Sequence, residues 1–179
     1  AMPLWMVFHN QIDIFRNEIS SSYGRGLVID LHGQSHPEQR IELGYLLNGQ
    51  MLRDFEANST DYSNQASIKS LISNNPQQVN FEQLIIGDNS LGTLLEFKGF
   101  DAVPSNSDQA PLENQLFFSG GHNTINYGSR DSGSIDAIQV ELNREGLRSE
   151  IEDRERFASV FSNILVDFLT IHYADALNP

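Results

Sequence analysis

A short apolar run, LVIDL at Leu27–Leu31, constrains the fold of this chain more than any other feature. It contains β-branched side chains and does not alternate between apolar and polar residues, which favours a strand buried on both faces. Such strands occur inside parallel or mixed sheets that carry helices on both sides. The run therefore predicts an α/β protein whose mixed sheet lies between two layers of helices.

The segments around this run complete an α/β pattern. Apolar residues spaced three or four apart predict a helix over 4–20, and a broad apolar stripe predicts a closing helix over about 150–169. The remaining expected elements are a strand at Ile41–Leu47, a short helix around 68–72, a helix between Asn80 and Gly87, a helix between Ser90 and Gly99, a surface loop at Val103–Pro111, a strand at Ile135–Asn143, and a capping box of Ser149 and Glu152 before the closing helix. We expect residues 1–179 to form a single α/β domain.

The charge balance limits the possible partners. The chain has 24 acidic and 11 basic residues and a formal net charge of -13. Nucleic acids and anionic membranes would be repelled by this charge, so we expect neither as a partner. The absence of cysteine excludes disulfides, thiolate nucleophiles and cysteine zinc sites. It leaves the cellular compartment open.

Two predicted strands end in ionisable groups. One ends at Asp30, Leu31 and His32, and the other at Glu141. In open α/β sheets ligands bind beyond the carboxyl ends of strands, so His32 and Glu141 are expected to share a crevice. His32 is a candidate metal ligand, with Asp30 behind it, and Glu141 is a candidate general base. The alternatives are a hydrogen-bonded turn histidine and an ordinary loop acid.

Other polar residues near these strand ends are weaker candidates. His36 is either part of a pocket wall or a plain loop residue. Arg40 and Glu42 alternate at the start of a strand and could equally form a surface ion pair. Gly120 and Gly121 leave backbone N–H groups able to face an anion, although glycine pairs mostly mark turns.

Three segments together resemble the N-formylglutamate amidohydrolase family: DLHGQSHPEQRIELGYLL, SLGTLLEFKGFDAVPS and FFSGGHNTINYGSRDSGSIDAIQVELNREGLR. The resemblance extends from about Trp5 to Tyr173. It implies a sheet like that of zinc carboxypeptidases and desuccinylases, and one zinc ion held by two histidines and a carboxylate. It also implies hydrolysis of the amide bond of an N-acyl, formyl-like amino acid or small peptide.

The resemblance also suggests roles for individual residues. His32 corresponds to the later zinc ligand and Glu141 to the base that activates water. Residues suited to bind a substrate carboxylate are Arg40, Asn126, Arg130 and Arg144, and groups suited to stabilise an oxyanion are Tyr127, Gly120 and Gly121. His122 stands where many relatives have tyrosine, in the wall of the pocket.

Nothing before His32 corresponds to the first histidine and acid of the family. The resemblance therefore implies that the chain is the C-terminal part of a longer amidohydrolase domain, with one sheet edge left uncovered. A second copy of the chain or an N-terminal piece of the same protein could cover that edge. The alternatives to an enzyme are a non-catalytic binding module with a relict pocket for acylated amino acids, and a structural domain.

Overall fold

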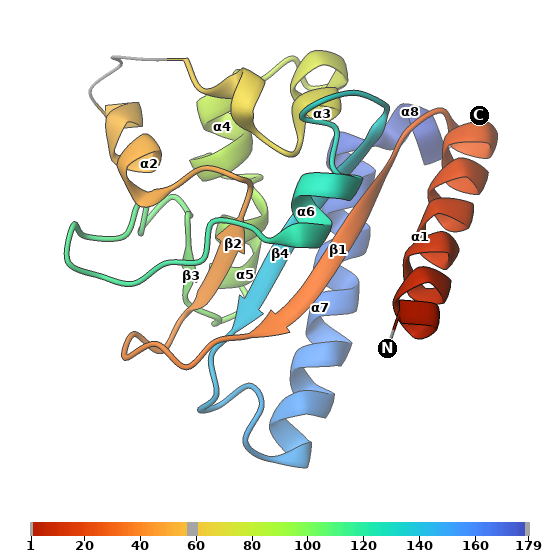
Figure 1. Cartoon of the computed structure of the whole chain (residues 1–179). Helices are drawn as coiled ribbons and strands as arrows, with labels where there is room; N and C mark the ends of the chain where they lie inside the picture. Colours follow the sequence, from red (N-terminus) through yellow and green to blue (C-terminus); the bar gives the residue numbers. More distant parts are fainter. Residues whose placement is uncertain (1, 57–60, 178–179) are drawn as a thin grey trace.

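In the computed structural model, the chain is described over residues 2–56 and 61–177. It is an α/β protein in which a sheet is surrounded by helices (Figure 1). In chain order the elements are α1 (Met2–Tyr23), β1 (Gly26–Gly33), β2 (Ile41–Gly44), α2 (Gly49–Glu56), the 3₁₀ turn η1 (Ser63–Gln65), α3 (Lys69–Asn74), α4 (Phe81–Ile86), α5 (Leu91–Glu96), β3 (Ala102–Val103), α6 (His122–Tyr127), β4 (Ile135–Leu142), α7 (Ile151–His172) and α8 (Ala174–Leu177).

The four strands form one mixed sheet in the order β1-β4-β2-β3. β1 runs parallel to β4 along its whole length, from the pair Gly26–Ile135 to the pair Gly33–Leu142. β2 is antiparallel to β4 and parallel to β3. The predicted mixed α/β sheet is therefore confirmed.

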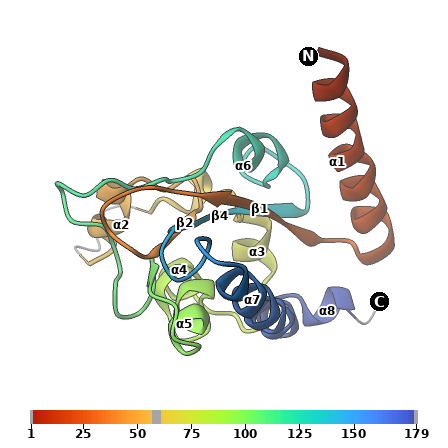
Figure 2. The same cartoon turned by 90° about the horizontal axis from the view of Figure 1, so that it is seen from below.

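Helices lie on both faces of this sheet (Figure 2). α6 lies on one face, and α3, α5 and α7 lie on the other. Ile138 and Val140 of β4 point into the second layer, where they join Phe157, Phe161 and Ile164 of α7 in the hydrophobic core. The α6 face of the sheet is thus left for more polar side chains.

The prediction that Leu27–Leu31 is buried on both faces is wrong. β1 is an edge strand, its residues 27–30 are only half-buried, and Leu31 is 55% exposed. The strand buried on both faces is β4, in which all eight residues are buried. β1 is apolar because Leu27 and Ile29 pack against the core from one side.

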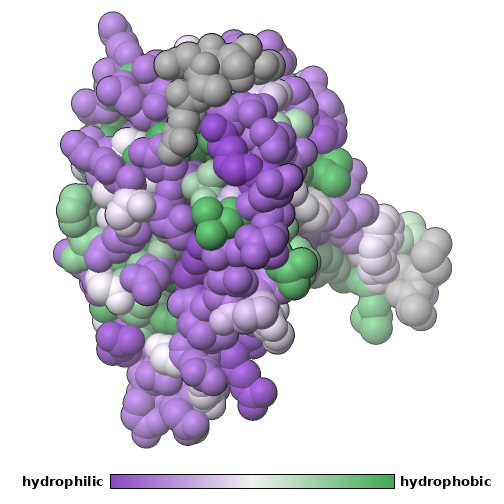
Figure 3. Space-filling view, turned by 90° about the vertical axis from the view of Figure 1, so that its left-hand side faces the viewer, coloured by the Kyte–Doolittle hydropathy of each residue, from purple (hydrophilic) through white to green (hydrophobic). Residues whose placement is uncertain are grey.

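The first helix is longer than expected; it contacts β1 and α6 along one side and leaves most of its surface exposed (Figures 1 and 3). Of the apolar stripe that predicted it, Ile12 and Ile19 are half-buried, while Leu4, Phe8 and Phe15 are exposed. The stripe therefore lies only partly against the domain. Among the described helices, none is both long and apolar enough to cross a membrane.

The helix boundaries follow the sequence signals unevenly. Asn80 caps α4 in a capping box with Gln83, and Ser90 caps α5, as predicted. The capping box predicted at Ser149 is wrong, because α7 begins after Glu150 and the Ser149 hydroxyl donates to the Arg144 carbonyl instead. β2 ends at Gly44 rather than at residue 47, and Leu46 then takes a left-handed φ of 65°.

Candidate active site

The polar side chains on the α6 face of the sheet gather where β1 and β4 end and β2 begins. His32, Glu141 and Glu42 are direct neighbours across three strands, since the sheet register pairs His32 with Glu141 and Glu141 with Glu42. Directly paired residues project from the same face of a sheet. We use the name carboxylate–histidine cluster for Asp30, His32, His36, Glu42 and Glu141.

His32 is held between two carboxylates of this cluster. Its Nε2 lies 3.0 Å from Oδ1 of Asp30, and its Nδ1 lies 3.9 Å from Oε1 of Glu141. The structure thus brings together the two predicted strand-end residues and puts Asp30 in contact with His32. The His32 side chain is 46% exposed, whereas those of Asp30 and Glu141 are nearly buried. The imidazole is therefore the accessible part of this group.

The second histidine of the cluster comes from the loop after β1. Nδ1 of His36 lies 2.8 Å from Oε1 of Glu42, and its ring stacks on Phe118 with the ring centres 4.6 Å apart. The other carboxylate oxygen of Glu42 accepts the backbone N–H of Phe118 at 2.7 Å. His36 is therefore fixed against Glu42 and Phe118, and Glu42 is fully buried.

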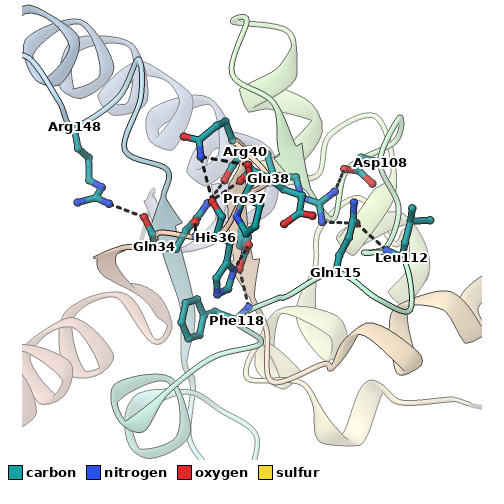
Figure 4. Close-up of polar contacts among 12 residues, drawn as sticks. Gln34, His36, Pro37, Glu38, Arg40, Asp108, Leu112, Gln115, Phe118 and Arg148 are labelled. Carbon is teal, nitrogen blue, oxygen red and sulfur yellow. Dashed lines mark hydrogen bonds and ion pairs between the residues drawn. The ribbon is translucent and has the colours of Figure 1, made fainter.

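The loop that carries His36 is fixed by Gln34 and Arg148 (Figure 4). The Gln34 amide donates to the carbonyls of Arg40 at 2.9 Å and Glu38 at 3.2 Å. The Arg148 guanidinium donates to the carbonyls of Gln34 at 2.7 Å and of Leu142 at 3.0 Å. These bonds tie the loop after β1 to the end of β4, so they set the position of His36 relative to Glu141.

The segment before α6 and the start of α6 pack against the sheet next to the cluster. Asn123 of α6 donates to Oδ1 of Asp30 at 2.9 Å, the same oxygen that contacts His32. The Gly120 backbone lies so close to Gly44 that an added Cβ on Gly44 would be 2.4 Å from the Gly120 nitrogen. The predicted glycine pair therefore lies beside the cluster, with Gly121 against the Gln139 side chain.

The electrostatics of the cluster favour protonation or a bound cation. Burial raises the pKa of Glu141, and the carboxylates of Glu42 and Asp30 raise it further. His32 and His36 oppose this increase. Three carboxylates at one site repel each other, so a positive charge between them is stabilised.

The arginines predicted to hold a substrate carboxylate are differently placed. Arg40 is buried and donates to Asp108 at 2.7 Å and to Gln115 at 3.0 Å (Figure 4). Arg130 pairs with its neighbour Asp131. Arg144 is exposed just after the end of β4. Arg40 therefore fixes the loop beside the cluster, and Arg144 is the most exposed of the three predicted arginines.

The remaining predicted residues lie on α6, and two of them, His122 and Tyr127, lie near His9 of α1. The Tyr127 hydroxyl contacts Nδ1 of His9 from α1, and the ring of His122 lies 5.2 Å from that of His9. Asn126 is exposed and its amide donates to the His122 carbonyl at 2.6 Å. Tyr127 and His122 therefore join α1 to α6, and none of the three has a contact with Glu141 among the described residues.

The sequence interpretation missed Glu42 and Asn123 as members of the site. For Glu42 the sequence suggested at most a surface ion pair with Arg40, and Asn123 has no distinctive sequence pattern around it. Only the antiparallel register of β2 on β4 brings Glu42 opposite Glu141. The glycine pair was the one local hint that the segment before Asn123 approaches the sheet closely.

The side chains of the cluster are of the types that bind zinc. Imidazole nitrogen and carboxylate oxygen are zinc ligands, and a carboxylate behind the histidine is the usual arrangement that orients it. Oδ2 of Asp30 is buried and accepts no hydrogen bond, so one acceptor of the cluster is unused. Within residues 2–56 and 61–177, however, no group of three or more such side chains is arranged to hold a metal ion.

Comparisons with protein-family models, with curated proteins and with solved structures found no match for this chain.

Proposed function

We propose that the carboxylate–histidine cluster is the active site of a zinc-dependent hydrolase that cleaves the amide bond of an N-acyl amino acid or small peptide. The observation that carries this proposal is the row His32–Glu141–Glu42, with an accessible imidazole beside a buried carboxyl of raised pKa. Perturbed carboxyl groups in contact with a histidine are typical of catalytic sites.

His32 would bind the zinc ion, and Asp30 would hold its ring in place. Zinc, when bound, supplies Lewis-acid activation of a water molecule and of the amide carbonyl. Glu141 accepts the proton of the attacking water and transfers it to the leaving amine. Its raised pKa suits both steps, because such a carboxylate is a stronger base than an exposed glutamate.

The substrate would meet the cluster from its exposed side, where His32 lies. Arg144 is the candidate to bind the substrate carboxylate, because guanidinium binds carboxylate through paired hydrogen bonds. The backbone around Gly120 and Gly121 is the candidate to stabilise the oxyanion that forms during hydrolysis.

Hydrolysis of a panel of N-formyl and longer N-acyl amino acids tests this function. Glu141→Gln keeps the size of the side chain but removes the base, so we expect turnover to fall roughly 10²–10⁴-fold with zinc still bound. The wild-type rate should fall as the pH decreases through the pKa of Glu141, at a higher pH than for an ordinary glutamate. Turnover that survives Glu141→Gln unchanged would show that Glu141 is not the base.

The second candidate is a binding module that recognises an acylated amino acid without cleaving it. It is favoured by the lack of a three-residue metal site among the described residues. Metal-free protein that binds N-acyl amino acids in calorimetry, and shows no turnover with added zinc, would support this candidate instead.

A further inference from the structure

The outer side of β1 has free hydrogen-bonding groups. The N–H groups of Gly26 and Gln34 point to β4, where they donate to Ser134 and Leu142. Alternate residues of a strand point the same way, so the backbone groups of Ile29, Leu31 and Gly33 face the opposite, open side. Among the described residues, no hydrogen bond to these groups from another strand is present. An unpaired edge of this kind is a template for another strand.

An apolar groove runs beneath the same edge, between β1 and α7. It has a volume of about 600 Å³ and lies under Leu31, the residue of β1 that is 55% exposed. Its apolar lining residues are Leu31, Leu142, Leu147, Phe157, Phe161 and Leu165. A strand added to β1 would place every second side chain over this groove, so backbone pairing and apolar burial would reinforce each other.

We propose that the occupant of this edge is β1 of a second copy of the chain. The two strands would run antiparallel around a two-fold axis at Leu31, joining the two sheets into one. Leu31 of each copy then faces Leu31 of the other over the two grooves, and Ile29 faces the partner's Gly33. The backbone N–H and C=O groups of all three residues face the open edge. The paired strands would therefore share about six backbone hydrogen bonds.

The charges of β1 favour this register over its neighbours. A two-fold axis at Leu31 places Asp30 opposite the partner's His32, and His32 opposite the partner's Asp30. This register keeps the two Asp30 carboxylates apart, whereas an axis one residue earlier would place them directly against each other. Self-complementarity of one patch is what a two-fold interface requires.

The position of α1 favours the same register. Ile19 of α1 lies against the start of β1, where a Cβ added to Gly26 would be 2.5 Å from the Ile19 side chain. α1 flanks the first part of β1, whereas the strand end at Gly33 extends beyond it (Figure 1). The open part of the edge is therefore the part centred on Leu31.

The opposite edge of the sheet is formed by a much shorter strand. β3 has two residues, and the surface seen from that side is mostly hydrophilic (Figure 3). β1 is therefore the longer of the two edge strands, and an apolar groove lies beside it. Both features point to association at β1.

Cysteine crosslinking tests the proposed register. The natural chain has no cysteine, so a single introduced thiol reports on one position. Facing residues of an antiparallel pair have Cα atoms about 5.5 Å apart, within the range for a disulfide. We expect Leu31→Cys to give a covalent dimer rapidly with diamide. Leu112→Cys, at a loop leucine that is 63% exposed, should stay largely monomeric as the matched control.

Sedimentation equilibrium of the unmodified chain tests the association itself. We expect a dimer at micromolar concentrations, a monomer for Leu31→Arg, and a dimer for the control Leu112→Arg, with circular dichroism confirming that each variant is folded. A wild-type monomer throughout this range would overturn the proposal. Equal crosslinking of Leu31→Cys and Leu112→Cys would also overturn it, even if Leu31→Arg failed to fold.

Discussion

β4 and β1 are parallel neighbours of equal length, yet they lie in different environments. Every residue of β4 is buried, including the carboxyls of Asp136 and Glu141, whereas β1 is half-buried and ends in exposed residues. The two strands meet at the pair His32–Glu141. The site therefore combines a buried acid from the centre of the sheet with an accessible imidazole from its edge.

This difference explains how one sheet can hold both a basic carboxylate and a solvent-facing ligand. Burial between β1 and β2 raises the pKa of Glu141. Within one copy of the chain β1 is an edge strand, and the His32 side chain is 46% exposed. The catalytic proposal depends on this asymmetry.

The first way to test the asymmetry is to truncate a matched pair of isoleucines. Ile138 of β4 and Ile29 of β1 are paired in the sheet, but Ile138 is fully buried and Ile29 only partly. Urea unfolding should show that Ile138→Ala lowers the free energy of unfolding by about 2–5 kcal/mol. Ile29→Ala should cost less than half as much as its partner. Equal losses would mean that β1 is as well covered as β4.

The second test uses the buried carboxyl at the start of β4. Burial raises the pKa of Asp136 to about 6, against the hydrogen bonds from Ser129 and Tyr173 that lower it. Because the folded state binds the proton more tightly, stability should fall as the pH rises from about 4 to about 6. The shift from 3.8 to about 6 corresponds to a loss of about 3 kcal/mol.

Asp136→Asn removes this titration and is the control for that pH dependence. Unfolding free energies measured from pH 4 to pH 7 should therefore be flatter for the variant than for the wild type. Parallel pH profiles for the two proteins would contradict the assignment of the slope to Asp136.

A smaller effect is expected where the ends of β1 and β4 are tied together. Arg148→Ala removes the hydrogen bonds to the carbonyls of Gln34 and Leu142, and should cost about 1–3 kcal/mol in thermal or urea unfolding. Arg148→Lys should recover only part of this, because an ammonium lacks the planar fork of a guanidinium. Full recovery by lysine would show that charge rather than geometry matters here.

The sequence predicted the helices and strands more accurately than it predicted which of them lie side by side. The fold class, the two long helices, the strand ending at Glu141 and the caps at Asn80 and Ser90 follow from periodicity and local hydrogen bonding, and the structure agrees. The wrong prediction for β1 arose because an apolar strand covered well on one face resembles a strand covered on both. The order of strands in the sheet decides which of these two cases applies, and the local sequence pattern does not determine that order.

The site was predictable to a similar extent. His32 and Glu141 could be paired because parallel strands present their carboxyl ends at one edge of a sheet. Glu42 could not be added, because its place depends on the antiparallel register of β2. Arg40 was predicted to bind a ligand, but its guanidinium donates to Asp108 instead. Asp108 lies 68 residues further along the chain, so no local sequence pattern could predict this contact.

The most direct test of the proposed function is the zinc content of the purified protein, measured by mass spectrometry for the wild type, His32→Ala and His122→Ala. We expect about one zinc per chain in the wild type, loss of zinc in His32→Ala, and full retention in His122→Ala, whose ring packs against α1 instead. Wild-type protein that binds no zinc even when zinc is supplied, or equal zinc in all three proteins, would contradict the assignment of this cluster as a zinc site.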